Sequence, residues 1–291
     1  MLLLAACLWG TGNVANKTVL NDLDPFAVAI ARNTVAFLVL LPFMLRDLAS
    51  VPHLAAWFRS ATPASVLFAV AIIVQQWGYQ SASVTNASFL VNTASVLTPL
   101  IAFVWLRERL HPCIGAAAAL TAVGAFLMSG AGNSLGAMNV GDIACLVSAM
   151  FYAAWTVALT KHARRHGKPF ATTCLHCAVA VVFAVAIWLQ FTPEQPGTFQ
   201  GALPEVLYLG LFSTAIAFAL TAAAQAHMSA SGCAVLLAAE SLFGAAGAML
   251  LLGERPGQLP SLGAALMLIA ILIVARSQTD PALHASPIAA P

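Results

Sequence analysis

ASVLTPLIAFVWLRER, residues 94–109, and AESLFGAAGAMLLLGER, residues 239–255, are two versions of one pattern. Each is an apolar run of helix length that ends in a glutamate and an arginine. A proline follows each run, and after it comes a second apolar run that opens with glycine, at Gly115 in the first case and at Gly263 in the second. The sequence therefore indicates two copies of one structural unit.

The composition indicates a membrane protein. Of the 291 residues, 61% are hydrophobic and only 8% are charged, whereas soluble domains carry about 25% charged residues. A helix needs about 20 apolar residues to cross a bilayer, and in lipid only helices or closed barrels satisfy their own backbone groups. Because the apolar runs are long and do not alternate, we predict an all-α integral membrane protein whose surroundings are the lipid bilayer. A net charge of +2 gives no indication of nucleic acid as a partner.

Charged residues, prolines and glycines divide the chain into ten apolar segments, at about residues 1–20, 26–45, 63–82, 84–106, 112–130, 140–160, 169–191, 203–226, 231–252 and 260–276. We expect residues 1–130 to hold helices 1–5 as the first repeat, and residues 140–276 to hold helices 6–10 as the second. Residues 277–291 contain three prolines and no span, so we expect a disordered C-terminal tail.

Lysine and arginine counts in the loops predict the orientation. Nine of them fall on one side of the membrane, namely Arg46, Arg59, Arg107, Arg109, Lys161, Arg164, Arg165, Lys168 and Arg276. The opposite loops hold only Arg255, so the positive-inside rule places both termini in the cytoplasm. Five spans per copy is an odd number, so the second copy enters the membrane from the other side. Inverted repeats of this kind are a common build for secondary transporters.

Several motifs stand out along the chain: WGTGNVANK at 9–17, DPFAVAIARNTVAFLVLLP at 24–42, FYAAWTVALTK at 151–161, and the two closing motifs Leu-Arg-Glu-Arg and Leu-Gly-Glu-Arg. Together they resemble the EamA-type repeat of the drug/metabolite transporter superfamily. The resemblance implies ten helices in two inverted bundles, and efflux of small metabolites, commonly amino acids. Two positions depart from the family pattern. Arg107 replaces the usual glycine, and Ser241 follows Glu240 where many members have proline, which leaves open whether the ninth helix is kinked.

Two ionisable residues lie deep in the predicted spans. Glu240 is about 13 Å into its span at 1.5 Å per residue, and each such group costs roughly 2.5–3.5 kcal/mol to insert. One hypothesis is that Glu240 carries a coupling proton, and the other is a structural carboxyl that is hydrogen-bonded to neighbouring helices. Arg32 could attract a substrate carboxylate, or snorkel to the interface and pair with Asp22 or Asp24. For Lys17, at the end of the first span, the interfacial interpretation is favoured.

Polar and aromatic residues form stripes along otherwise apolar helices. Such stripes face a cavity or hold helices together, and the aromatic and amide clusters at mid-depth favour a cavity. The candidate substrate-binding residues are Trp9, Asn13, Arg32, Gln76, Tyr79, Asn92, Tyr152 and Trp155. The aromatic rings would stack on the apolar part of a substrate, and the amides would hydrogen-bond its polar end. His176 and His227 have no carboxylate at a convincing spacing, so we interpret both as structural.

These observations favour a secondary transporter that exports amino acids or similar small metabolites across a bacterial inner membrane by alternating access. No phosphate-binding loop of the G-x-x-x-x-G-K-[ST] type occurs, so ATP does not drive it. We expect no cofactor and no metal, and the six cysteines read as small apolar residues. Efflux of lipophilic cationic drugs is the alternative function, and an intramembrane enzyme is a distant one. The fifth and tenth spans, rich in glycine and alanine, are expected to be scaffold or the contact of a homodimer.

Overall fold

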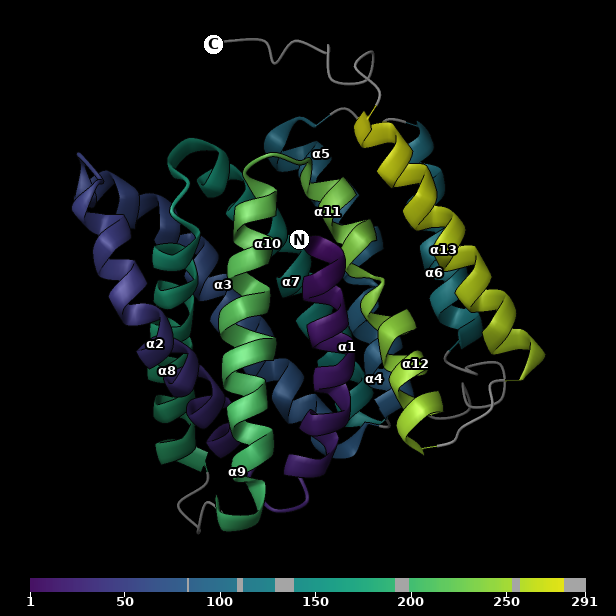
Figure 1. Cartoon of the computed structure of the whole chain (residues 1–291), viewed down its shortest axis with the longest axis horizontal. Coiled ribbons are helices and arrows are strands. Elements are labelled where there is room, and N and C mark those ends of the chain that lie inside the picture. The colour runs from purple at the N-terminus through teal and green to yellow at the C-terminus, as the bar shows by residue number, and fades with distance from the viewer. Residues whose placement is uncertain (83, 109–111, 129–138, 192–198, 253–256, 280–291) are drawn as a thin grey trace.

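The computed structural model describes residues 1–82, 84–108, 112–128, 139–191, 199–252 and 257–279, which form a helical bundle without a β-strand among them (Figure 1). The helices are α1 (Leu2–Val19), α2 (Pro25–Ala49), α3 (Leu54–Ser81), α4 (Val84–Asn92), α5 (Ala94–Leu106), α6 (Pro112–Met128), α7 (Val140–His166), α8 (Pro169–Phe191), α9 (Phe199–Tyr208), the π-helix η2 (Leu209–Ile216), α10 (Ala217–Gln225), α11 (Ala230–Leu237), α12 (Glu240–Leu252) and α13 (Gln258–Thr279). The prediction of an all-α membrane fold is confirmed.

Each predicted span corresponds to a helix or to consecutive helical pieces. The fourth span is α4 with α5, the eighth is α9 with η2 and α10, and the ninth is α11 with α12. Eight of the described segments are long and apolar enough to cross a membrane, and α6 is a shorter apolar helix. The central helix α1 is not among the eight, because Asn13, Asn16 and Lys17 lower its hydropathy.

Some predicted boundaries were wrong. α3 begins at Leu54 and not at residue 63, because Pro63 lies inside the helix instead of ending it; membrane helices tolerate proline where neighbouring groups re-satisfy the backbone. α7 continues to His166, beyond the predicted end at 160. α13 continues to Thr279, and the remainder of the predicted tail, like Arg109, Glu254 and Arg255, lies outside the described residues.

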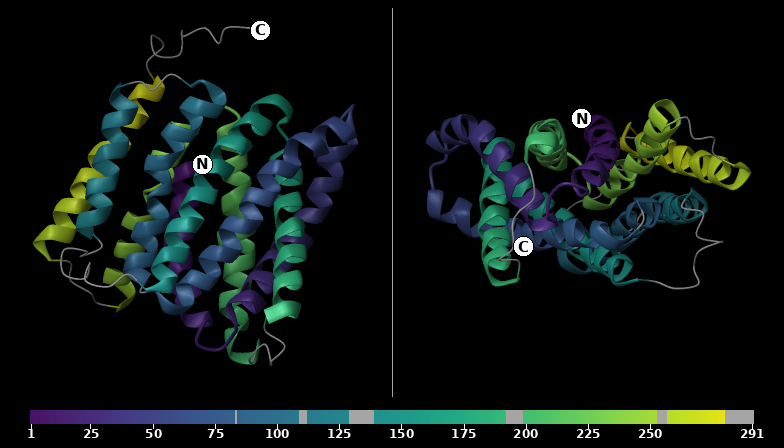
Figure 2. Two further views of the ribbon diagram at one scale, coloured as in Figure 1. Left: turned by 180° about the vertical axis from the view of Figure 1, so that it is seen from behind. Right: turned by 90° about the horizontal axis from the view of Figure 1, so that it is seen from below.

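The helices pair in a pattern that is unchanged when the two sets of five spans are exchanged. The second span packs on the seventh (α2 on α8) and the fifth on the tenth (α6 on α13), and these pairs form opposite edges of the bundle (Figures 1 and 2). The first span packs on the ninth and the eighth, just as the sixth packs on the fourth and the third. Two repeats related by a two-fold axis produce such a pattern.

Glycines allow two of these pairs to approach closely. A Cβ atom at Gly124 on α6 would lie 2.6 Å from the carbonyl oxygen of Gly263 on α13. A Cβ atom at Gly10 on α1 would lie 2.7 Å from the backbone nitrogen of Gly244 on α12. Small residues at such contacts let membrane helices pack backbone against backbone.

Arg107 occupies a conformation that suits glycine. It follows the last residue of α5 with φ 51° and ψ 32°, in the left-handed region. A side chain there costs roughly 1–2 kcal/mol, and helices most often end with glycine in this conformation. Arg107, which replaces the usual glycine of the motif, therefore has a backbone conformation that favours glycine.

Candidate functional site

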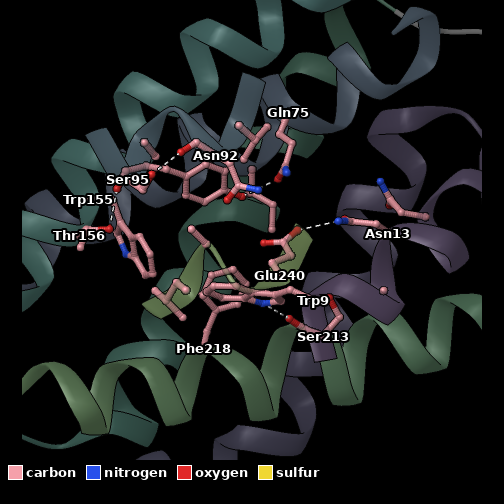
Figure 3. Close-up of a pocket in the computed structure, with 18 of the residues that line it drawn as sticks. Trp9, Asn13, Gln75, Asn92, Ser95, Trp155, Thr156, Ser213, Phe218 and Glu240 are labelled. Carbon is pink, nitrogen blue, oxygen red and sulfur yellow. Dashed lines mark hydrogen bonds between the residues drawn. The ribbon is translucent and has the colours of Figure 1, made fainter. Parts of the chain in front are cut away.

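A cavity of about 90 Å³ lies inside the bundle, between the two repeats (Figure 3). Pieces of α1, α2, α3, α4, α5 and α7 meet pieces of η2, α10, α11 and α12 around it. Its polar and aromatic lining residues are Trp9, Asn13, Asn16, Arg32, Gln75, Tyr79, Asn92, Ser95, Thr98, Tyr152, Trp155, Thr156, Ser213, Phe218 and Glu240. The space is several times what one water molecule needs, so a small solute fits it.

The structure brings eight of the nine predicted site residues to this one cavity, namely Trp9, Asn13, Arg32, Tyr79, Asn92, Tyr152, Trp155 and Glu240. Gln76 is not among the lining residues, and Gln75 takes its place. One residue along a helix turns the side chain by about 100°, so Gln75, four residues before Tyr79, shares its face of α3 and Gln76 does not. Gln76 is buried, and its Nε2 makes no hydrogen bond with the described residues.

Ser213 and Thr98 also line the cavity, and the sequence analysis missed both. Thr98 lies six residues after Asn92 on the same broken span, so extending the polar stripe of that span would have included it. Ser213 precedes Thr214, which begins the polar stripe of its span with Thr221 and Gln225. One residue turns a helix by about 100°, so Ser213 lies off that stripe and the sequence carried little signal for it.

Glu240 opens α12 and faces α1. Nδ2 of Asn13 donates a hydrogen bond of 2.6 Å to Oε1 of Glu240, as the dashed line in Figure 3 shows. The hydroxyl of Tyr79 in turn donates to Oδ1 of Asn13 at 3.2 Å. The first turn of a helix favours a negative charge, so α12 and Asn13 together can hold a carboxylate at the cavity wall. The contact with Asn13 is also what the structural interpretation of Glu240 expects, so both interpretations stay open.

Arg32 is buried, with 7% of its surface exposed, and reaches across to the eighth span. Its Nε donates to Oγ1 of Thr214 at 3.0 Å, and its Nη2 donates to Oγ of Ser213 at 3.2 Å. Asp24, a partner considered for Arg32, instead caps α2 by accepting from the N–H groups of Phe26 and Ala27. Among the described residues Arg32 therefore has neutral hydrogen-bond partners only, and no ion pair balances its positive charge beside the cavity.

The π-helix η2 explains how one helix meets both Arg32 and Trp9. In a π-turn the chain carries an extra residue, and such turns are frequent at functional sites. The hydroxyl of Thr214 donates to the carbonyl of Leu209, five residues back, at 2.7 Å. The carbonyl oxygen of Ser213 accepts a hydrogen bond of 2.8 Å from Nε1 of Trp9. The irregular turn thus fixes a cation and an aromatic ring on the same wall.

Aromatic rings form another part of the wall. The ring of Phe218 lies 4.8 Å from that of Trp9 and 5.5 Å from that of Trp155, between ring centres. The hydroxyl of Tyr152 donates to Oε1 of Gln75 at 2.7 Å. Trp155 and Asn16 also line the cavity, and Nε1 of Trp155 and Oδ1 of Asn16 are buried without a hydrogen-bond partner among the described residues. The site therefore combines an apolar, aromatic surface with polar side chains.

Two broken helices meet at the cavity. The fourth span is interrupted at Thr93, and the ninth is interrupted at Ala238 and Ala239, just before Glu240. Nδ2 of Asn92, at one break, donates a hydrogen bond to Oγ of Ser241, at the other. The ninth span is therefore interrupted even though serine replaces the usual proline. Half-helix ends at mid-membrane are typical of substrate sites in inverted-repeat transporters.

The chain is similar to known transporters and to a solved structure over nearly its whole length. A model described as "EamA-like transporter family" matches residues 1–130 and 139–276. Two proteins of Archaeoglobus fulgidus, each named "Uncharacterized transporter", are similar over nearly the whole chain. The match to the first is 27% identical and spans 94% of this chain and 84% of the relative. The match to the second is 23% identical and spans 96% of this chain and 97% of the relative. A solved structure titled "Crystal structure of protein" has the same fold, with a TM-score of 0.76 at 16% identity over 96% of each chain.

Proposed function

Because the chain belongs to the EamA-like transporter family, it is a multi-pass membrane transporter of small molecules, and we propose that it carries amino acids or similar small zwitterionic metabolites. The names of the family and of the relatives indicate a transporter and not an enzyme. We propose export across the bacterial inner membrane by alternating access of two inverted repeats, residues 1–130 and 140–276, with both termini in the cytoplasm. The positive-inside bias of the loops supports this orientation.

The observation that carries the proposal is the pair of opposite charges in one small cavity. Arg32 and Glu240 both line it, and they form no ion pair with each other or with another residue of the described part of the chain. A zwitterion brings one carboxylate and one ammonium group. Its carboxylate would meet Arg32 and its ammonium group would meet Glu240, so each buried charge would gain the partner that its burial requires.

The size of the cavity supports a small substrate. Pockets for drug-sized ligands measure about 300–1,000 Å³, whereas this cavity measures about 90 Å³. The aromatic rings of Trp9, Tyr152, Trp155 and Phe218 give the side chain of an amino acid an apolar surface to contact. Efflux of lipophilic cations remains the second candidate, because aromatic rings beside the carboxylate of Glu240 suit a cation. Arg32 opposes that function, since its charge would repel such a substrate.

Counterflow in proteoliposomes tests the proposal. Vesicles that hold the full chain are loaded with one unlabelled amino acid at a time, and a labelled trace is added outside. We expect saturable accumulation with some amino acids and its loss in Trp9→Ala, which removes both the ring contact with Phe218 and the hydrogen bond to Ser213. Accumulation of a lipophilic cation, with no accumulation of any amino acid, would instead establish the second candidate.

A further inference from the structure

A second polar cluster lies away from the cavity, where α3, α7 and α8 meet at the end of the bundle that carries the α7–α8 connection. It contains His162 and His166 on α7 and His176 on α8. His162 and His176 are buried, with exposed fractions of 0% and 1%. Ionisable side chains inside membrane segments are expensive, and chains of histidines and acids serve as proton relays in pumps and transporters. The structural role predicted for His176 leaves this clustering unexplained.

The hydrogen bonds of His162 define a neutral ring held between two hydroxyls. Its Nε2 lies 3.2 Å from Oγ1 of Thr172, and that hydroxyl donates to the carbonyl of Lys168 at 2.9 Å. Thr172 therefore accepts from Nε2–H. Nδ1 then accepts from Oγ of Ser60, 3.0 Å away. The ring of the partly exposed His166 stacks on that of His162 at 5.2 Å, so the cluster reaches the end of α7.

His176 carries a buried nitrogen that is free to accept a proton. Its Nδ1 lies 2.8 Å from Oγ of Ser65, and Ser65 donates to the carbonyl of Ala61 at 3.0 Å. Ser65 therefore accepts from Nδ1–H, which leaves Nε2 with a lone pair. Nε2 is buried and makes no hydrogen bond within the described residues. A basic nitrogen without a donor at this depth is rare in a purely structural core.

The histidines form a row that leads to the cavity. Thr172 and His176 are one turn apart on α8, about 6 Å at 1.5 Å per residue. The ring of His176 lies 6.1 Å from that of Trp155, which lines the cavity. Phe68 stacks on His176 at 5.2 Å and meets Phe218 at 4.7 Å. In this structure aromatic rings therefore stand between the row and the cavity.

We propose that the row His166, His162 and His176 is a proton path between the cavity and the inner face of the membrane. The proposal rests on the transport function proposed above. A proton from the cavity binds Nε2 of His176, the proton on Nδ1 passes to Oγ of Ser65, and the hydroxyl proton of Ser65 leaves towards His162. His162 takes one proton at Nδ1 and releases the proton on Nε2 towards His166 and the solution, so each ring returns to its starting charge, and a turn of each ring restores its starting tautomer. A substrate that moves the ring of Trp155 opens the path, which ties proton movement to transport.

The charged groups of the surrounding helices fit release at the inner face. Arg165 adjoins His166 on α7, and Arg59 lies near the same end of α3. On α2, Arg32 faces the cavity, and Asp47 accepts a hydrogen bond from the N–H of Ala171 at 3.1 Å. The charge that adjoins His166 along α7 is thus positive, which disfavours retention of a proton on His166. α10, which also packs on α8, contributes the neutral Phe218.

The test compares substrate exchange with proton movement in the same proteoliposomes. Vesicles contain the full chain and an entrapped pH-sensitive dye, and the probe is an amino acid that shows counterflow. His176→Gln and His162→Gln keep a side chain that forms hydrogen bonds but cannot carry a proton. We expect the dye signal driven by a substrate gradient to fall at least tenfold, with counterflow within twofold of wild type. The control is His227→Gln, which alters an exposed histidine between α10 and α11 and is expected to change neither readout.

Each other outcome overturns a definite part of the reasoning. An unchanged dye signal in His176→Gln, or a wild type with counterflow but no proton movement, would overturn the proton path and leave the transport function standing. Absence of counterflow in the wild type would overturn the transport function itself. If His176→Gln also loses counterflow, Ser65→Ala decides, since it keeps His176 and removes only the acceptor at Nδ1. A several-fold weaker dye signal in that variant supports the path, and an unchanged signal refutes it.

Discussion

Replacing Arg32 by glutamine tests how the cavity recognises a substrate. Arg32 is buried, and its Nε and Nη2 are bound by the hydroxyls of Thr214 and Ser213, so the guanidinium is held in place before a substrate arrives. Truncating one partner of a buried, hydrogen-bonded charge pair costs about 2–5 kcal/mol. Since 1.4 kcal/mol is a factor of ten, we expect Arg32→Gln to weaken binding of the transported amino acid about 30-fold or more.

The assay is a double-perturbation cycle, in which Arg32→Gln is one change and removal of the carboxylate from the substrate is the other. Two concentrations are measured in wild type and in Arg32→Gln. The first is the concentration of the amino acid that gives half-maximal counterflow, and the second is the concentration of the corresponding amine that half-inhibits this counterflow. The amino acid should lose affinity in the variant, whereas the amine should keep or gain it because a repulsive charge is gone. The control is Lys17→Gln, which removes a cation from α1 that does not line the cavity. Equal losses for both ligands would refute the assignment of the carboxylate to Arg32.

Three further predictions concern the site and the fold. Glu240→Gln should weaken counterflow, because it removes the carboxylate that would meet the ammonium group of the substrate, and should also lose accumulation driven by a pH gradient; full retention of pH-driven transport would exclude a coupling proton on Glu240. Arg107→Gly should raise the free energy of unfolding by about 0.5–1 kcal/mol. The change removes the steric cost of a side chain in the left-handed conformation, and the greater freedom of glycine in the unfolded chain offsets part of that gain. A thermal unfolding midpoint at or below that of wild type would contradict this. Gly124→Ala should destabilise the α6–α13 contact by about 1–3 kcal/mol through overpacking, whereas the control Gly115→Ala, whose Cβ atom would meet nothing within 4 Å, should keep or slightly raise the midpoint.

Much of the fold could be predicted from the sequence, because membrane spans are set by length and hydropathy and the repeat was visible in residues 94–109 and 239–255. The polar stripes led to most of the cavity wall, since a polar residue at depth has few places to lie other than against another polar group or a cavity. Gln76 shows the limit of that reasoning. Adjacent glutamines at 75 and 76 look alike in a sequence, and only the packing of α3 decides which of them faces inward.

Irregular backbone was the part that the sequence did not reveal. The π-turn in LGLFSTAI adds one residue to a helix, and the single glycine of the segment, Gly210, does not distinguish a π-turn from an α-helix. The approach of Ser213 and Thr214 to Arg32 was therefore not foreseen. The interruption at Ala238 and Ala239 is likewise formed by residues with high helix propensity. Tertiary contacts, including the one between Asn92 and Ser241, outweigh that propensity.

The pairing of one positive and one negative group in the cavity has an electrical consequence. When Glu240 is ionised, the empty walls contribute one charge of each sign from Arg32 and Glu240, and a bound zwitterion adds none. Both the loaded and the empty carrier can then change conformation without moving net charge, so the membrane voltage neither drives nor resists exchange. A proton that travels inward in the same cycle changes this, because each elementary charge gains about 2.3 kcal/mol per 100 mV. At a potential of that size, the voltage alone would sustain a roughly 50-fold concentration ratio of the exported solute.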